Sequence, residues 1–307
     1  MIRAFQKEDN NRMLTISTLA VEQISGLSRL DCLVSGATKL ISLPDIYYRL
    51  EVAIESPSST IADFSNLLAS DPDLCARLLS MANSAFYSFP SKIDTIDRAI
   101  STIGLRQIRE LVLATSVIKT FNKVPLGMVN MNSFWEHSVA VGVFAKSLAQ
   151  YAGLPYSERF YVPGLLHDIG RLVMFLKVPD LMHELLLQRD SQKQHLFVLE
   201  HEQLFYTHAD VGGRILESWN IPQSIYEPVA FHHRPDQSGE FAVMSSAVHI
   251  ADAWVNKYSV GSSGERFTPQ INPEATRLLG IEESELDKVW RIAVDDINDV
   301  IRQFVCH

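Results

Sequence analysis

Apolar residues recur along most of the chain at intervals of three and four positions, with polar residues between them. This spacing places apolar side chains on one face of an α-helix, whereas a half-buried strand would need strict alternation. Helix-start signals interrupt the pattern: Thr60 precedes Asp63, and Asp71 precedes Pro72. The same cap spacing recurs at Ser133–Glu136, Thr207–Asp210 and Ser224–Glu227. We therefore predict an all-α fold made of two packed helical subdomains.

The first subdomain is predicted to cover residues 1–125. Its beginning, residues 1–41, has the least regular pattern, and a short amphipathic helix there would serve as a lid or an interaction arm. Further on, Gly104 separates two helical patterns, and this joint has the outline of a DNA-binding helix-turn-helix. A tight corner between packed helices is the favoured interpretation, because the apolar residues after Gly104 need a core.

The second subdomain is predicted over residues 126–258, and residues 259–307 add a loop and a C-terminal helix. The pattern from about Glu282 onward is that of a long amphipathic helix. Packing of its apolar face on its own chain is favoured over a dimer face, which stays open as the alternative.

Composition and charge limit the classes of protein and the cellular location that fit this chain. Of the 307 residues, 47% are hydrophobic and 21% are charged, which is enough for a large buried core. The net charge of −9 argues against nonspecific binding to nucleic acid or to an anionic membrane. The cysteines Cys32, Cys75 and Cys306 are far apart, and neither a signal peptide nor a membrane-spanning apolar run is seen. We expect a cytoplasmic protein.

An adjacent histidine and aspartate, His167 and Asp168, follow an apolar run and precede Gly170. Burying both side chains is costly unless they have a partner. The cost falls if both bind one cation, because imidazole nitrogen and carboxylate oxygen suit zinc, manganese or iron. The pair is therefore the starting point of a candidate metal site.

Further candidate ligands lie at helix ends or on the inner side of apolar helices. The full set is His137, His167, Asp168, His208, His232, His233 and Asp252. Five imidazoles and two carboxylates could fill two adjacent metal positions, with Asp168 as the bridge because a carboxylate has two oxygens. The remaining histidines are interpreted as core or surface residues: His183, His195, His201, His249 and His307.

This ordered series on successive helices resembles the HD superfamily of metal-dependent phosphohydrolases, in the branch with two extra histidines. Four earlier segments resemble the HDOD family, the HD-related output domain of bacterial signalling proteins: Leu43–Ile46, Ser70–Leu79, Ala82–Tyr87 and Ala99–Leu105. The segments Phe134–Ser138 and Gly164–Gly170 fit both families. The HDOD resemblance covers roughly residues 30–255.

The resemblance implies two functions. The leading one is a signalling or regulatory output module that acts through a protein partner of unknown identity, with a metal site that is structural or vestigial. The alternative is a metal-dependent phosphohydrolase acting on a nucleotide or another phosphate ester. The resemblance then implies that His137, His167, Asp168 and Asp252 hold one metal, and that His208, His232 and His233 complete a second.

Two details set the chain apart from HD enzymes that hydrolyse cyclic di-GMP. The residues after His233 lack their Gly-Tyr-Pro signature, and Arg171 stands where they typically have lysine. Arginine is a poor proton donor but can grip a phosphate through two bonds. In the enzyme interpretation Asp168 and Arg171 are the catalytic candidates, and whether the chain is an enzyme is left open.

Overall fold

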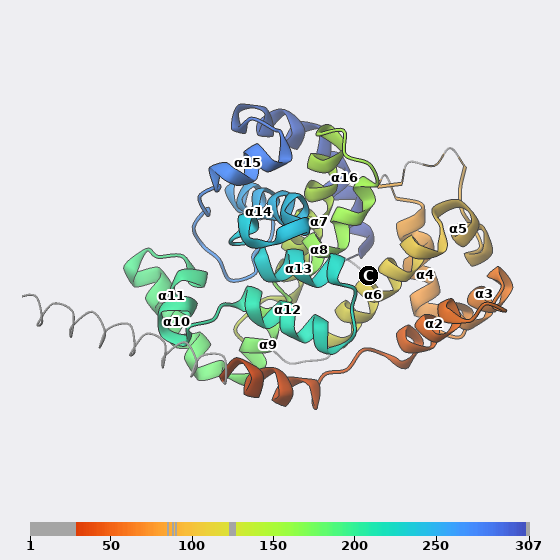
Figure 1. Ribbon diagram of the computed structural model, residues 1–307, viewed down its shortest axis with the longest axis horizontal. Helices are drawn as coiled ribbons and strands as arrows, with labels where there is room; N and C mark the ends of the chain where they lie inside the picture. Colours follow the sequence, from red (N-terminus) through yellow and green to blue (C-terminus); the bar gives the residue numbers. More distant parts are fainter. Residues whose placement is uncertain (1–28, 85, 88, 90, 123–126, 305–307) are drawn as a thin grey trace, which may run out of the picture.

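The computed structural model describes residues 29–84, 86–87, 89, 91–122 and 127–304. Within these ranges the chain is helical and contains no β-strand, so the all-α prediction is confirmed (Figure 1). No described helix is long and apolar enough to cross a membrane. A first helix covers residues 29–38, whereas most of the expected N-terminal arm, and both Cys306 and His307, lie outside the described residues.

The amino-terminal part is a group of short helices that surrounds one longer helix. The helices are α2 (Asp45–Glu55), α3 (Ile61–Ala69), α4 (Pro72–Ala82), α5 (Ile96–Ile103) and α6 (Leu105–Phe121). The helix caps predicted from the sequence are confirmed at α3 and α4. Thr60 and Asp63 form a reciprocal capping box at α3, and the Asp71 carboxylate accepts a hydrogen bond from the Leu74 N–H at α4.

The longer helix α6 is buried on most of its surface. It packs against α2, α4, α5 and α8, and Ile108, Val112 and Val117 are fully buried. Gly104 has a φ of +93°, which lets the chain turn sharply between α5 and α6. A recognition helix needs a free face to enter a DNA groove. The turn at Gly104 therefore joins two packed helices, which agrees with the favoured interpretation.

The carboxyl-terminal part is built around α7, which packs against α8, α14 and α16. Its helices are α7 (Met131–Tyr151), α8 (Tyr161–Leu166), α9 (Ile169–Lys177), α10 (Pro179–Gln192), α11 (Leu196–Leu204), α12 (His208–Ser218), α13 (Gln223–Phe231), α14 (Ala242–Lys257), α15 (Pro273–Leu279) and α16 (Leu286–Phe304). Four 3-10 segments connect them: η1 (Ser157–Phe160), η2 (Pro235–Gln237), η3 (Gly239–Phe241) and η4 (Glu283–Glu285).

The C-terminal helix α16 joins the two parts of the chain. It packs against α7 and against α4, and its apolar residues Val289, Trp290 and Ile297 are buried there. In Figure 1 it runs from the top of the molecule down behind α7 and α8 toward α4 and α6. The apolar face therefore packs on its own chain, as expected. The predicted subdomain boundary at residue 125 stays a prediction.

Candidate metal centre

The seven predicted ligands lie in two adjacent groups in the interior of the protein. The first group is His137, His167, Asp168 and Asp252, and the second is His208, His232 and His233. Within each group, one ligand atom from every residue lies within 4.8 Å of the others. The helices that bring them together are α7, the α8–α9 junction, α12, the end of α13, and α14.

The His167–Asp168 pair sits at a break between two helices. The sequence places the pair at the C-terminal end of a helix that starts near Ser157, with a turn at Gly170. In the structure α8 ends at Leu166 and α9 begins at Ile169, so the pair lies just after the helix end and the turn comes slightly earlier. The break leaves both side chains pointing toward α7 and α14. His167 Nε2 lies 3.1 Å from Asp168 Oδ2, and His137 Nε2 lies 3.1 Å from the Oδ1 atom of Asp252.

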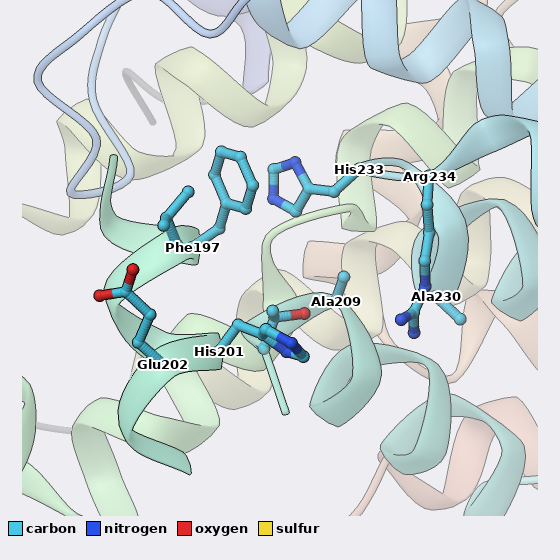
Figure 2. Close-up of a pocket in the computed structure, with 9 residues that line it drawn as sticks. Phe197, His201, Glu202, Ala209, Ala230, His233 and Arg234 are labelled. Carbon is cyan, nitrogen blue, oxygen red and sulfur yellow. The ribbon is translucent and has the colours of Figure 1, made fainter. Parts of the chain in front are cut away.

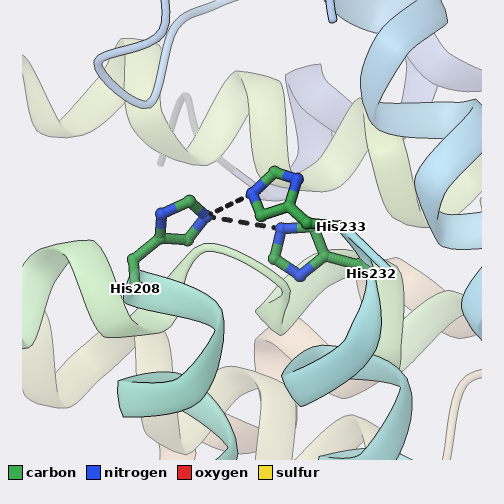
Figure 3. Close-up of side chains that lie close together, drawn as sticks. All are labelled: His208, His232 and His233. Carbon is green, nitrogen blue, oxygen red and sulfur yellow. Dashed lines mark hydrogen bonds between the residues drawn. The ribbon is translucent and has the colours of Figure 1, made fainter. Parts of the chain in front are cut away.

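The second group brings three imidazole rings together (Figure 3). Thr207 and Asp210 form the predicted capping box of α12, which makes His208 the first residue of that helix. His232 and His233 follow the last residue of α13. The Nε2 atom of His208 lies 3.3 Å from Nε2 of His232 and 3.0 Å from Nε2 of His233.

Asp168 lies between the two groups. Its Oδ2 atom is 3.1 Å from His167 Nε2 and 3.8 Å from His137 Nε2, on the side of the first group. Its Oδ1 atom is 2.9 Å from His208 Nε2, on the side of the second group. One carboxylate thus offers one oxygen to each group, which is the arrangement that a bridge between two metal ions requires.

Backbone carbonyls fix how two of the imidazoles are protonated. His167 Nδ1 lies 2.8 Å from the Gly164 carbonyl oxygen, and His232 Nδ1 lies 2.7 Å from the Val229 carbonyl oxygen. Because a carbonyl can only accept, both Nδ1 atoms carry a hydrogen. The neutral form of each ring, which is the form that binds a metal, therefore has its lone pair on Nε2. These lone pairs point into the site, which suits metal ligation.

Glu200 on α11 orients His208 in the same way. Its Oε2 atom accepts hydrogen bonds from His208 Nδ1 at 2.6 Å and from the His208 backbone N–H at 2.8 Å. By contrast, His167 Nε2 and Asp168 Oδ1 are buried without a hydrogen bond of acceptable geometry among the described residues. Each of these atoms has a polar neighbour from another candidate ligand within 3.1 Å, and a cation bound between them would satisfy both.

The charge balance around the site is negative. The buried acidic residues are Asp168, Glu200, Asp252 and Glu265, and the buried guanidinium that faces them is that of Arg171. Arg171 lies 3.4 Å from Asp168 Oδ1, 4.0 Å from Glu265 Oε2, and donates a hydrogen bond to Ser263. One guanidinium and one protonated imidazole, that of His167, do not balance four buried carboxylates, and divalent cations would supply the missing positive charge.

The pKa values follow from this balance. Burial lowers the pKa of His167, but the carboxylates of Asp168 and Asp252 outweigh it and raise the pKa to about 10. Burial, together with neighbouring imidazoles, holds the pKa values of His232 and His233 well below their usual range, so both rings stay neutral. Without metal, the first group therefore holds a proton that a cation would displace.

Sequence reasoning missed several residues that support the ligands. Glu200 and Glu265 have no distinctive spacing, and Asn256, which donates a 2.7 Å hydrogen bond to Asp252 Oδ1, follows Asp252 by one helical turn. The sequence could have indicated only Asn256, because residues four positions apart on a helix are neighbours. Glu200 and Glu265 could be recognised only from the structure, which places α11 and the loop after α14 beside the site.

His249 holds the backbone of a ligand in place. Its Nδ1 atom donates to the His232 carbonyl oxygen at 2.8 Å, and its Nε2 atom accepts from the Asn272 N–H at 2.9 Å. The sequence favoured simple core packing for this residue. His183 and His201 are exposed and His195 is half-buried, so none of these three belongs to either ligand group.

Two glycines allow the close approaches that build the site. A Cβ atom on Gly170, in the first turn of α9, would collide with the His208 carbonyl oxygen and would lie 2.6 Å from Gly212 N. Gly261, with a φ of +61°, passes against the backbone of α7 at His137. Gly170 therefore serves helix packing beside the ligands.

The comparisons with known proteins agree with this architecture. Residues 40–235 match the HDOD domain family. A protein of unassigned function from Treponema pallidum (strain Nichols) is 25% identical over 212 residues, which are 68% of this chain and 41% of that protein. The chain thus spans less than half the length of this relative.

Solved structures share the fold. An HDOD domain protein of unknown function from Geobacter sulfurreducens has a TM-score of 0.72 at 22% identity, over 90% of this chain and 98% of that one. A candidate phosphohydrolase from Shewanella amazonensis SB2B has a TM-score of 0.66 at 23% identity, over 89% and 97%. A candidate signal transduction protein from Marinobacter aquaeolei VT8 has a TM-score of 0.67 at 18% identity, over 92% and 66%.

An all-helical fold with an HD-like arrangement of histidines and aspartates defines the class of protein. The family match covers more than half of the chain, and the chain belongs to the HDOD family.

Proposed function

We propose that this protein is a signal-transduction output module whose second half is organised around a binuclear divalent-metal centre. His137, His167, Asp168 and Asp252 would hold one ion, and His208, His232 and His233 would hold the other with Asp168 as the bridge. The observation that carries this proposal is the placement of the Asp168 oxygens, one toward each histidine group.

The donor set points to the kind of metal. Five imidazole nitrogens and two carboxylates suit iron, manganese or zinc, whereas calcium and magnesium prefer all-oxygen sites. Buried metal ligands from α7, α12, α13 and α14 would cross-link these helices, and ion binding would then stabilise the fold. Arg171, whose guanidinium is occupied by Asp168, Ser263 and Glu265, would balance charge next to the bridge.

Elemental mass spectrometry of protein purified without a tag tests the centre. We expect about two equivalents of iron, manganese or zinc per wild-type chain. Asp168→Asn removes the bridging charge and should lose both ions. His208→Ala leaves the first group intact and should keep about one equivalent. His183→Ala, at an exposed histidine, is the matched control and should keep both. Folded wild-type protein that takes up no metal on reconstitution would refute the proposal.

The output is proposed to act through a protein partner that binds the amino-terminal part. Tyr48 and Val52 on α2 expose large apolar surfaces beside a groove that Leu67 on α3 also lines. Exposed apolar surface of this kind is typical of protein-binding sites. Val52→Asp should lose partners that Asp168→Asn retains, as measured by quantitative affinity purification. Equal recovery with Val52→Asp would exclude this surface.

A second function, phosphate-ester hydrolysis, is favoured by one specific observation. A cavity of about 310 Å³ reaches His233 of the second ligand group, and a phosphate ester could approach the metals from there. Two metal ions can activate water and polarise a phosphoryl oxygen. Release of p-nitrophenol from mono- and bis-(p-nitrophenyl) phosphate by metal-loaded protein, lost in Asp168→Asn, would support this function. No release with iron, manganese or zinc would exclude it for these substrates.

A further inference from the structure

The cavity beside the metal centre has walls from three helical segments (Figure 2). Phe197, Val198 and His201 come from α11, Ala209 comes from the first turn of α12, and His233 follows α13. At about 310 Å³ its volume lies at the small end of the range for pockets that hold small molecules. The cavity is therefore large enough for a single-ring compound.

His233 connects the cavity to the candidate metal centre. The other six predicted ligands are buried, whereas His233 is half-buried and lines the cavity. Its Nε2 atom points the other way, to within 3.0 Å of His208 Nε2. Anything bound in the cavity would contact a ligand of the second group directly.

The lining favours an apolar occupant with an aromatic ring. The rings of Phe197 and His233 stack on each other, with a centroid distance of 4.1 Å and an interplanar angle of 15°, so they leave no gap between them and form one aromatic wall of the cavity. Figure 2 shows the two rings next to each other, above His201 and Ala209 in this view. The side chains of Val198, Ala209 and Ala230 complete a mainly apolar wall. Aromatic rings add stacking energy to burial in such a setting.

The charges favour an anionic group on that occupant. Arg234 and His201 line the cavity, and Glu202, which accepts a hydrogen bond from Gln194, lies across from Arg234 in Figure 2. Arg234 is also paired with Asp210, so this local charge is nearly balanced. The deciding contribution comes from behind His233, where metal ions would create a positive potential that attracts anions.

We propose that this cavity is the binding site of a small aromatic anion, and that its occupancy is coupled to metal binding through His233. The inference rests on the proposed metal centre. Coupling is reciprocal: if metal strengthens anion binding by some factor, the anion strengthens metal binding by the same factor. Binding of a soluble aromatic acid or phosphate ester in the cavity would then change the metal affinity of the centre.

Isothermal titration calorimetry with phenylphosphonate, which resists hydrolysis, tests the site on the full chain loaded with manganese. We expect phenylphosphonate to bind at least tenfold more tightly than methylphosphonate or benzyl alcohol, which each carry half of its chemistry. Val198→Phe fills the cavity and should weaken binding at least tenfold. Leu187→Phe, at an exposed leucine on α10, is the matched control and should bind like wild type. Removal of the metal should also weaken binding at least tenfold.

The outcomes separate the two proposals. Unchanged binding in folded Val198→Phe, or methylphosphonate binding as tightly as phenylphosphonate, would overturn the cavity site. Equal affinity with and without metal would overturn the coupling. Metal content measured on the same samples tests the metal centre independently. His201→Ala, at an exposed position that the fold tolerates, gives a second variant and should weaken phenylphosphonate binding severalfold.

Discussion

Asp168 Oδ1 lies 2.9 Å from His208 Nε2, and this contact links the two groups of candidate ligands. The other oxygen of the same carboxylate faces His167 and His137. The two groups therefore share one side chain, that of Asp168.

Glu200→Gln should weaken binding of the second metal ion by about 10- to 100-fold. The amide keeps the shape of the side chain but loses the charge that orients His208 and increases its basicity. Competition with a metal chelator measures the affinity. Glu202→Gln, on the same helix but exposed, is the control and should match wild type. Equal affinities for both variants would show that Glu200 has no influence on the metal.

Gly170→Ala should destabilise the protein by about 1–3 kcal/mol and reduce its metal content. The added methyl group collides with the backbone at His208, so α9 and α12 must move apart beside the bridge. Urea denaturation and elemental analysis measure both effects. Gly127→Ala is the control, because its Cβ atom would meet nothing within 4 Å. A Gly170 variant as stable and as metal-rich as wild type would contradict the packing described here.

Metal-free protein should become less stable as the pH rises from about 6.5 to about 10. Burial lowers the pKa of His167, but Asp168 and Asp252 raise it to about 10 overall. The folded state thus holds this proton more tightly than the unfolded state. The resulting stabilisation is complete below the pKa that His167 has in the unfolded state. It is lost as the pH rises through the pKa that His167 has in the folded state.

Urea titrations in the presence of a chelator measure this pH dependence. The free energy of unfolding of His167→Gln serves as the reference, because other groups titrate in the same range. We expect the difference between wild type and variant to shrink with rising pH, and bound metal to abolish the decline. A difference that stays constant from pH 6.5 to pH 10 would be inconsistent with a raised pKa.

Ile297→Ala should cost about 2–5 kcal/mol, because this side chain of α16 is fully buried against the same chain. Ile292→Ala, on the exposed side of α16, should change stability by less than about 0.5 kcal/mol. Denaturation at several protein concentrations compares the two. If Ile292→Ala were the costlier change and its effect depended on concentration, the exposed side of α16 would be a dimer face.

Local sequence signals were enough for most of the helices. The start of α3 at Thr60, of α4 at Asp71 and of α12 at Thr207 could be read directly, because a cap depends on residues three positions apart. Two other predicted helix starts were wrong, because the same cap spacing also occurs inside a helix. The structure starts α7 after Asn130 and α13 after Pro222, whereas the sequence suggested Ser133 and Ser224 as caps.

The sequence by itself determined the helical class, the family and the seven candidate ligands, because periodicity, caps and motif order are properties of neighbouring residues. Only the tertiary structure decided which atoms meet. It placed one oxygen of Asp168 toward each histidine group, selected Glu200 over Glu202 as the partner of His208, and enclosed Arg171 among carboxylates. These contacts join helices far apart in the chain, and their geometry depends on how closely α9, α11 and α12 pack.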